Sequence, residues 1–438
     1  MARLNKKDPL YTHEGAVAVK INAEKELRRS VLSCLLWENT FYESGESIAD
    51  RITNLCSRVS PEIIANLAIE ARHQHHLRHV PLLLLRSLVR YGNGKIVQDT
   101  IAQVISRPDE LGEFVSIYWQ DKNNKKIIPA QMKKGLARAL SKFNEYSLQK
   151  YNGKDAAVKI KDVLFLSHAK PKDEEQDQLW KKLIAGTLQT PDTWETELSA
   201  GKDKKETFER LIREEKLGYF ALLRNLRNMI NADCDLKLVK NEILAKKRGA
   251  DKILPFRYIA AARAAPQLEK ELDHALCDTI NSLPVLDGTT VVLVDVSDSM
   301  NDKLSGKSDL SRADAAAALA SIINSEYLRV FSFSSNVVEV PARKGMAGVD
   351  TILKSQYHSS TRLGEAIDHV SKIDYDRLIV ITDEQSHDRV KLQHKDRKNY
   401  MINVASYQNG VGYNDGWHHI DGFSENVIRW IIENEKEA

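Results

Sequence analysis

Little in this sequence points to a secreted, membrane-bound or disulfide-stabilised protein. Only 4 cysteines occur, and their wide spacing without a CxxC pair argues against a disulfide framework or a zinc knuckle. No apolar run approaches the roughly 18–20 residues that a membrane-spanning helix needs. Residues 1–9 (MARLNKKDP) lack the apolar stretch of a secretory signal. We therefore expect a reduced, cytoplasmic protein that is not attached to a membrane.

The amino-acid usage is that of a globular protein. Hydrophobic residues make up 42% and charged residues 29% of 438 residues, with 20 Gly and 11 Pro, which excludes collagen-like and wholly disordered chains. A chain of this length exceeds one ordinary core, so two or three domains are expected.

The charge is divided unevenly along the chain. Residues 286–438 contain 17 Lys+Arg and 23 Asp+Glu, a net charge of −6. Subtraction from the totals of 64 and 61 leaves 47 and 38 in residues 1–285, a net charge of +9. The densest basic stretch is 121–161, with 11 Lys+Arg against 3 acidic residues. A basic first part favours a polyanionic partner, and an acidic second part suits cations.

The hydrophobic pattern also changes near residue 285. Before it, apolar residues recur at helical spacing in many short segments, as in 63–68 and 82–89, with almost no period-2 alternation. This pattern predicts an all-α domain over 1–285 built of stacked helical pairs of the HEAT type. The alternative is a long all-helical globule without repeats.

The second part alternates between strand and helix patterns. A doubly wound, parallel α/β domain is therefore predicted over 286–438, after a linker at 282–288 that contains Pro and Gly. The expected strands are 289–294, 327–334, 377–382 and 401–406, and the expected helices are 312–325, 363–371 and 424–434.

Three loops at predicted strand or helix ends carry oxygen donors. The sequence Asp-x-Ser-x-Ser directly follows the strand 289–294, at the crevice where open α/β sheets bind ligands. A threonine before the helix 363–371 and an aspartate after the strand 377–382 complete the set. Hard oxygen donors suit Mg²⁺ or a similar cation rather than zinc. The predicted metal ligands are Asp295, Ser297, Ser299, Thr361 and Asp383.

This order of motifs resembles the metal-ion-dependent adhesion site of von Willebrand factor A domains, which have a Rossmann-like fold. Two departures occur: Ser359 and Ser360 precede the threonine where glycines are usual, and Glu384 follows Asp383 where glycine is common. The whole chain resembles the Ro autoantigen, or TROVE-domain, family of RNA-binding proteins. The supporting stretches are WENTFYESG at 37–45, VLFLSH at 163–168, ALLRNLRNM at 221–229 and DGF at 421–423.

The resemblance implies a non-enzymatic, metal-binding ribonucleoprotein component. In that family a ring of HEAT-like repeats is closed by the A domain. Its hole accepts single-stranded 3′ ends of misfolded noncoding RNA, while Y RNAs bind the outer basic face. The resemblance further implies a bacterial or phage member, monomeric in itself, that works with a 3′→5′ exoribonuclease in RNA quality control. It also implies Mg²⁺ in the A domain.

Candidate RNA-binding residues come from two arguments. Lys133, Lys134, Arg138 and Lys142 share a helix face, and cations on such a face suit phosphates. The resemblance adds residues at the rim and in the ring interior: Lys150, Lys154, His168, Arg224 and Arg227. By contrast, we expect 219–223 (YFALL) to belong to the core. Four histidines between 73 and 79 are flanked by Arg72 and Arg78, which disfavours a metal and favours a face turned to RNA or solvent.

Two other functions stay open. The A domain could be a cation-dependent protein-binding module, with the helical part as a scaffold. A metal-assisted hydrolase built on Asp295, with Asp298 or His387 as the base, is disfavoured, because the sequence has neither carboxylates in separated environments nor a glycine-rich phosphate loop.

Overall fold

A computed structural model describes most of the chain. The described residues are 10–18, 20–32, 44–120, 127–153, 155–253, 255–303, 310–405, 410–412, 416–422, and positions 427, 428, 431 and 435. The chain divides into two compact units. We call residues 23–37 with 45–196 the helical unit, and residues 1–22, 38–44 and 197–438 the mixed unit. Within the described residues, no helix is both long and apolar enough to cross a membrane.

The helical unit consists of short helices whose ends carry recognisable signals. Helix α3 has a proline in its first turn, and in α10 the Asp173 side chain accepts a hydrogen bond from Gln176 N at 2.8 Å. The helices are α1 (Ala23–Leu32), α2 (Gly45–Cys56), α3 (Pro61–His73), α4 (His79–Tyr91), α5 (Gly94–Val104), α6 (Pro108–Trp119), α7 (Ala130–Leu140), α8 (Glu145–Lys150), α9 (Ile160–Ser167) and α10 (Glu174–Ala185). Helix α11 (Trp194–Ser199) follows.

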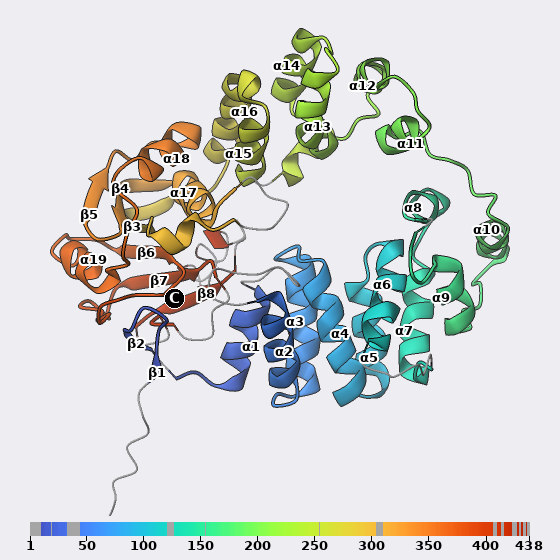
Figure 1. Ribbon diagram of the computed structural model, residues 1–438, viewed down its shortest axis with the longest axis horizontal. Coiled ribbons are helices and arrows are strands. Elements are labelled where there is room, and N and C mark those ends of the chain that lie inside the picture. Colours follow the sequence, from blue (N-terminus) through green and yellow to red (C-terminus); the bar gives the residue numbers. More distant parts are fainter. Residues whose placement is uncertain are drawn as a thin grey trace, which may run out of the picture. The chain divides into compact units, whose positions relative to one another are not determined.

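These helices are stacked in two layers. Odd-numbered helices α1, α3, α5 and α7 pack in succession on one another, and α2, α4 and α6 do the same beside them. Figure 1 shows the stack along the blue to cyan part of the chain. A single apolar core runs through it, from Leu27 in α1 to Leu183 in α10. This packing is that of a helical repeat array, in which each helix buries its apolar face on its neighbours.

The mixed unit begins with helices and ends in a sheet (Figure 1). The helices before the sheet are α12 (Lys204–Arg213), α13 (Tyr219–Asn231), α14 (Leu236–Ala245), α15 (Pro255–Ala264) and α16 (Glu269–Asn281). The same alternate packing continues, because α13 packs on α15 and α14 packs on α16. An N-terminal hairpin of β1 (Leu10–Tyr11) and β2 (Val17–Ala18) also belongs to this unit.

The sheet has six strands in the order β5-β4-β3-β6-β7-β8. Its strands are β3 (Leu286–Asp295), β4 (Ser325–Phe333), β5 (Val337–Val340), β6 (Arg377–Thr382), β7 (Lys398–Asn403) and β8 (His418–Asp421). All neighbours are parallel except β4 and β5, which form an antiparallel pair. The sheet is therefore mixed at one edge, where a parallel sheet was predicted.

Both faces of the sheet are covered, as in a doubly wound fold. Helix α19 (Leu363–Val370) packs on a core that includes Val291 and Leu293 of β3. The alternate residues of β3 are also buried, and the alanine-rich α17 (Arg312–Ile322) packs against β3 and β6. Helix α18 (Gly345–Leu353) packs on α17. The fully apolar runs of β3 and β6 follow from this burial on two sides.

The predicted order of a helical region followed by an α/β region is confirmed. Four predicted strands correspond to β3, β4, β6 and β7, and two predicted helices correspond to α17 and α19. Strands β5 and β8 and helix α18 were missed; the two strands are only four residues long and lie at the sheet edges. The predicted tail helix 424–434 lies mostly outside the described residues, as does the stretch WENTFYESG.

Candidate metal centre and nucleic-acid interface

Four of the five predicted metal ligands lie at the carboxyl ends of two neighbouring strands. Asp295 ends β3, and Asp383 directly follows β6, which pairs with β3. From β3 the chain passes to β4 on one side, whereas β6 lies on the other side. Such a change of direction leaves a crevice at the strand ends, which is where open α/β sheets bind ligands.

Hydrogen bonds join the first loop to the second carboxylate. Ser299 Oγ donates to Asp383 Oδ2 at 2.6 Å, and the hydroxyls of Ser297 and Ser299 lie 3.4 Å apart. Asp295 accepts hydrogen bonds from Ser297 N at 2.9 Å and from the hydroxyl of Thr382 at 2.6 Å. The structure therefore brings four of the five predicted ligands into one hydrogen-bonded cluster.

Thr361, the fifth predicted ligand, is held by its backbone. Its N–H donates to His387 Nδ1 at 3.1 Å, and its carbonyl oxygen accepts from His387 N at 2.8 Å. The same stretch joins the first loop, because Asp298 N donates to Ser359 O at 2.9 Å. In the described part of the chain, no protein hydrogen bond is found for the Thr361 hydroxyl, although the residue is buried.

The cluster is buried and negatively charged. Asp295 and Asp383 have no exposed surface. Burial raises the pKa of Asp295, and the neighbouring charge of Asp383 raises it further. Burial also raises the pKa of Asp383, against the opposing effects of Ser299, the Gln385 amide and Arg312. Two carboxylates this close favour a bound cation, since a cation offsets both the burial and the repulsion.

The donor chemistry fits a hard divalent cation. Every side-chain donor in the cluster is a carboxylate or hydroxyl oxygen, with neither nitrogen nor sulfur, which matches Mg²⁺. Over the described residues, no group of three or more His, Cys, Asp or Glu side chains is arranged to hold a metal. The cluster has only two carboxylates, so a partner or water would supply further ligands.

The sequence did not predict the buried ion pair that holds the loop after Asp383. Glu384 has a φ of +62°, a backbone conformation that glycine adopts easily and that explains why glycine is usual at this position. Its buried carboxylate forms an ion pair with His419 Nε2 and accepts from Gly412 N at 2.7 Å. Burial alone would lower the pKa of His419, but Glu384 and Asp421 raise it to about 9. This pair fixes the loop that carries Asp383.

The N-terminal hairpin covers the other side of that loop. Thr12 Oγ1 donates to Ser386 O at 2.8 Å, and His13 N donates to Gln385 Oε1 at 2.8 Å. Glu14 Oε2 lies 2.8 Å from His387 Nε2. Contacts with the hairpin and with Thr361 thus fix the position of the His387 ring. No local signal joins residues 374 positions apart, so sequence reasoning could not find this contact.

Two of the predicted RNA-binding residues in the helical unit come together. Lys133 Nζ lies 3.3 Å from His168 Nε2, where His168 ends α9 in a left-handed conformation. Lys134, on the same helix as Lys133, is exposed, and no ionic partner is found for it among the described side chains. Helix α7 and the end of α9 therefore form a small basic surface.

Other predicted RNA-binding cations have partners within the protein. Arg138 forms an ion pair with Asp99. Lys142 Nζ donates to the carbonyl oxygens of Ala102 and Ile105 and so caps the end of α5. These contacts partly neutralise the positive charges of Arg138 and Lys142, which the sequence predicted to be available for RNA phosphates.

The remaining predicted residues lie at separate places. Lys150 is 3.4 Å from Glu195 and lies over the rings of Tyr146 and Tyr151 at 5.8 and 5.9 Å. Lys154 lies outside the described residues. Arg224 and Arg227 are exposed on α13 in the mixed unit, and Arg227 Nε donates to Ala264 O at 3.1 Å.

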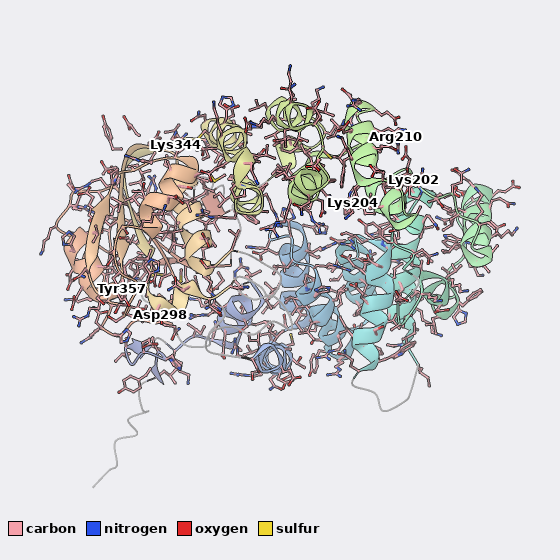
Figure 2. The ribbon with its side chains drawn as sticks, turned by 45° about the horizontal axis from the view of Figure 1, so that its top comes forward. Lys202, Lys204, Arg210, Asp298, Lys344 and Tyr357 are labelled. Atoms are coloured by element: carbon pink, nitrogen blue, oxygen red, sulfur yellow. The ribbon has the colours of Figure 1, made fainter. Side chains whose placement is uncertain are left out.

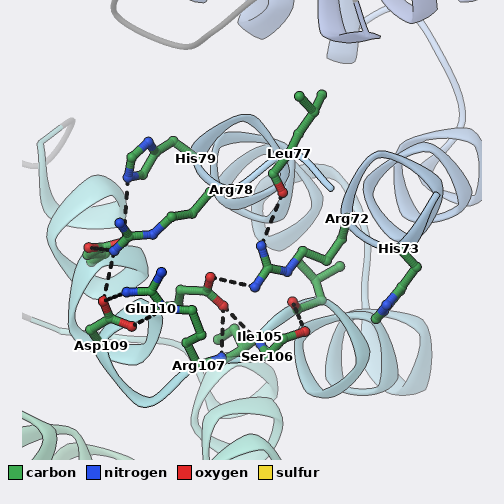
Figure 3. A network of polar contacts seen from close by, with 12 residues as sticks. Arg72, His73, Leu77, Arg78, His79, Ile105, Ser106, Arg107, Asp109 and Glu110 are labelled. Carbon is green, nitrogen blue, oxygen red and sulfur yellow. Dashed lines mark hydrogen bonds and ion pairs between the residues drawn. The ribbon is translucent and has the colours of Figure 1, made fainter. Parts of the chain in front are cut away.

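The two arginines that flank the four histidines form ion pairs within the protein. Figure 3 shows Arg72 and Arg78 turned toward the start of α6. Arg72 NH2 lies 2.6 Å from Glu110 Oε1, and Arg78 pairs with Asp109 at 2.8 Å and with Glu113. His73, His76 and His79 are exposed as expected, whereas His75 is half-buried and lies 3.4 Å from Glu70.

Parts of this chain are similar in sequence to known proteins, and its fold is similar to that of a solved structure. Residues 171–284 match the family model described as the TROVE domain. Over 102 residues the chain is 31% identical to telomerase protein component 1 of Mus musculus, an alignment that covers 21% of this chain and only 4% of the mouse protein. The crystal structure of the Deinococcus radiodurans Ro (Rsr) protein matches with a TM-score of 0.60 and 17% identity, over 94% of this chain and 100% of that chain. At this identity the structural match establishes a shared fold.

Proposed function

Because this chain contains a TROVE domain and has the fold of the Deinococcus Ro protein, we propose that it is a noncoding-RNA-binding protein. It acts as a scaffold in RNA quality control and performs no chemistry of its own. The observation that carries the proposal, beside the TROVE match, is the basic surface at which Lys134 and His168 are exposed and Lys133 lies half-buried beside His168. Y-RNA-like molecules and single-stranded 3′ ends are the expected ligands, and a 3′→5′ exoribonuclease is the expected partner.

The physical basis is the neutralisation of phosphates. Each Lys or Arg that contacts a phosphate releases condensed counterions, so affinity falls with salt. Arg138 and Lys142, on or next to the same helix, add to this surface less strongly, because their charges have internal partners. Lys150, which pairs with Glu195, and Lys154 are proposed as further RNA contacts. Arg224 and Arg227 on α13 contact the single-stranded part of the RNA.

Filter binding of the full chain to a single-stranded RNA and to a structured hairpin RNA tests this function. With about four phosphates neutralised, affinity for the single-stranded RNA should fall roughly 50-fold between about 50 and 200 mM salt. The double substitution Lys133→Ala with Lys134→Ala should weaken binding, whereas Lys354→Ala with Lys372→Ala, at exposed positions of the acidic part, should not. Absence of a salt dependence in the wild-type protein would sink the proposal.

A second function rests on the buried oxygen cluster: a cation-dependent protein-binding site. Asp295, Ser297, Ser299, Thr361 and Asp383 would hold Mg²⁺, which supplies an open coordination position for a partner's carboxylate. The rim of the cluster includes exposed side chains suited to contact. Tyr357 is 88% exposed and precedes by two positions Ser359, whose carbonyl oxygen accepts from Asp298 N; Figure 2 labels Tyr357 and Asp298.

Pull-downs with and without a chelator separate the two functions. The Asp295→Ala variant should lose magnesium-dependent capture of a protein partner and keep its RNA binding. Capture that is equal with and without the chelator would rule out the cation-dependent site. Both functions are compatible within one protein, because they use residues of opposite charge.

A further inference from the structure

Aromatic rings and guanidinium groups alternate on one surface of the mixed unit. Arg257 Cζ lies 4.5 Å from the ring centroid of Phe256 and 5.3 Å from that of Phe220. Arg224 Cζ lies 5.7 Å from the centroid of the same Phe220 ring. We call these four residues, Phe220, Arg224, Phe256 and Arg257, the Phe–Arg platform. It lies on α13 and on the first turn of α15.

The platform is exposed, which contradicts the assignment of residues 219–223 to the core. Tyr219, Leu222 and Leu223 are buried as expected, but Phe220 is 40% exposed. Arg224 and Arg257 are exposed as well, and Phe256 is half-buried. The Phe220 ring lies between the guanidinium groups of Arg224 and Arg257, and part of its surface is open to solvent. This combination of an exposed ring and two cationic planes suits a flat ligand that carries negative charge.

The neighbouring core holds the two helices firmly in register. Tyr219 is buried against Tyr258, with ring centroids 6.2 Å apart, and its hydroxyl donates to Ile243 O at 2.6 Å. Arg227 joins α13 to the end of α15 through its hydrogen bond to Ala264 O. Because Tyr219 and Tyr258 point inward, the adjacent Phe220 and Arg257 project outward together. The surface is thus preorganised by buried contacts beneath it.

We propose that the Phe–Arg platform stacks unpaired nucleobases of single-stranded RNA. The proposal rests on the proposed RNA-binding function and specifies which part of the RNA this site takes. Flat rings and guanidinium planes stack on the π-faces of bases, and the guanidinium charges pair with the adjacent phosphates. An acidic peptide would use the two arginines but would leave both phenylalanine rings without a role. A duplex hides its base faces, so the platform selects unpaired nucleotides.

The test compares RNA with and without bases. Fluorescence anisotropy measures binding of the full chain to a single-stranded oligoadenosine, to the same strand in a duplex, and to a strand of equal length with abasic sites. The wild-type protein should bind the oligoadenosine best. Phe220→Leu keeps an apolar side chain but removes the ring, so it should weaken oligoadenosine binding about 10-fold and leave the abasic strand unaffected. Phe220→Trp should restore the affinity.

A matched control uses an exposed aromatic residue elsewhere in the same unit. Tyr327 on β4 is exposed, and among the described residues no cation lies over its ring. Tyr327→Leu should bind all three probes as the wild-type protein does, and thermal melts should find all variants folded. Arg224→Ala should reduce the dependence of affinity on salt, whereas Phe220→Leu should not.

The outcomes separate the platform from the proposed function. Failure of the wild-type protein to bind any single-stranded RNA overturns the RNA-binding function and the platform with it. Wild-type binding that is unchanged in Phe220→Leu, or that falls equally for the abasic strand, overturns the platform alone. A fourth probe is polyglutamate. If the Arg224→Ala variant loses binding to polyglutamate but keeps its RNA affinity, the surface binds an acidic peptide instead.

Discussion

The surface around α7 and the carboxyl end of the sheet differ in the sign and the burial of their charged groups: the first has basic groups at the surface, and the second has buried carboxylates. Around α7, Lys134 and His168 are exposed, and Lys133 lies half-buried beside His168. At the sheet, Asp295 and Asp383 are fully buried, with hydroxyls as their neighbours. Exposed cations in high dielectric interact weakly with single ions but collectively with a polyanion. Buried carboxylates interact strongly with one small cation and are costly without it.

The difference predicts two kinds of recognition, of a polyanion at the lysines and of a small cation at the carboxylates. A surface of exposed lysines tolerates single substitutions, because each contact contributes a similar small amount. A buried cluster of two carboxylates loses its function with either one. The predictions below change one region at a time, from the largest expected effect to the smallest.

Removal of one buried carboxylate should have the largest effect. Asp295→Asn leaves the shape of the cluster but halves its carboxylate charge, so Mg²⁺ affinity should fall about 100-fold or more. Isothermal titration calorimetry measures this directly. Asp298→Asn, at an exposed position beside the cluster, should retain wild-type affinity; an equal loss there would contradict the assignment of Asp295.

The buried Glu384–His419 pair should make the mixed unit sensitive to alkaline pH. The pKa of His419 is raised from 6.5 to about 9, so the stabilisation is complete below pH 6.5 and is lost as pH rises through 9. The loss should be about 3 kcal/mol in the free energy of unfolding. Urea unfolding at a series of pH values measures it. His419→Gln should flatten this part of the profile, and an unchanged profile would mean that the histidine is not charged.

On the helical surface, one lysine should matter more than its neighbouring arginine. Lys134→Ala should lower RNA affinity about 3- to 10-fold and reduce the salt slope by about 1. Arg138→Ala should have a smaller effect, because Asp99 already neutralises part of the arginine charge. Binding measured across a salt series compares the two variants. Equal losses would mean that the Arg138–Asp99 pair opens when RNA binds.

The smallest effect is expected for an ion pair in the helical unit. Burial alone would raise the pKa of Glu70, but His75 and Arg28 lower it to about 2. The stabilisation is present above pH 4.5 and is lost as pH falls toward 2. Because Arg28 is well exposed, Arg28→Ala should cost less than about 1 kcal/mol near neutral pH. Thermal melts at low and high salt measure this; a cost that persists at high salt would exclude a surface ion pair.

Local patterns were sufficient to predict that the oxygen donors after β3 and β6 meet, but not to predict their surroundings. Asp295 and Asp383 were predicted because parallel strands end at one edge, so residues after two strands meet there. The Glu384–His419 pair was missed, since β8 is four residues long and its pairing with β7 has no sequence signal. Phe220 was placed wrongly in the core, because an apolar run of five residues on a helix cannot lie on one face.

The resemblance to TROVE and Ro proteins is confirmed by the TROVE match over 171–284 and by the shared fold. It did not identify which cations are available to a ligand. Lys134 and Arg138 look alike in the sequence, and only the position of Asp99, on another helix, separates them.

The sequence by itself determined the order of helical and α/β regions, the strand ends that carry oxygen donors, and the excess of basic charge in the first part. These properties follow from periodicity and composition, which act within a few neighbouring residues. Only the tertiary structure decided which charges are neutralised, that the hairpin at 10–18 covers the loop after β6, and that Phe220 faces outward between two arginines. Those features depend on contacts between residues far apart in the chain, whose energies no local pattern encodes.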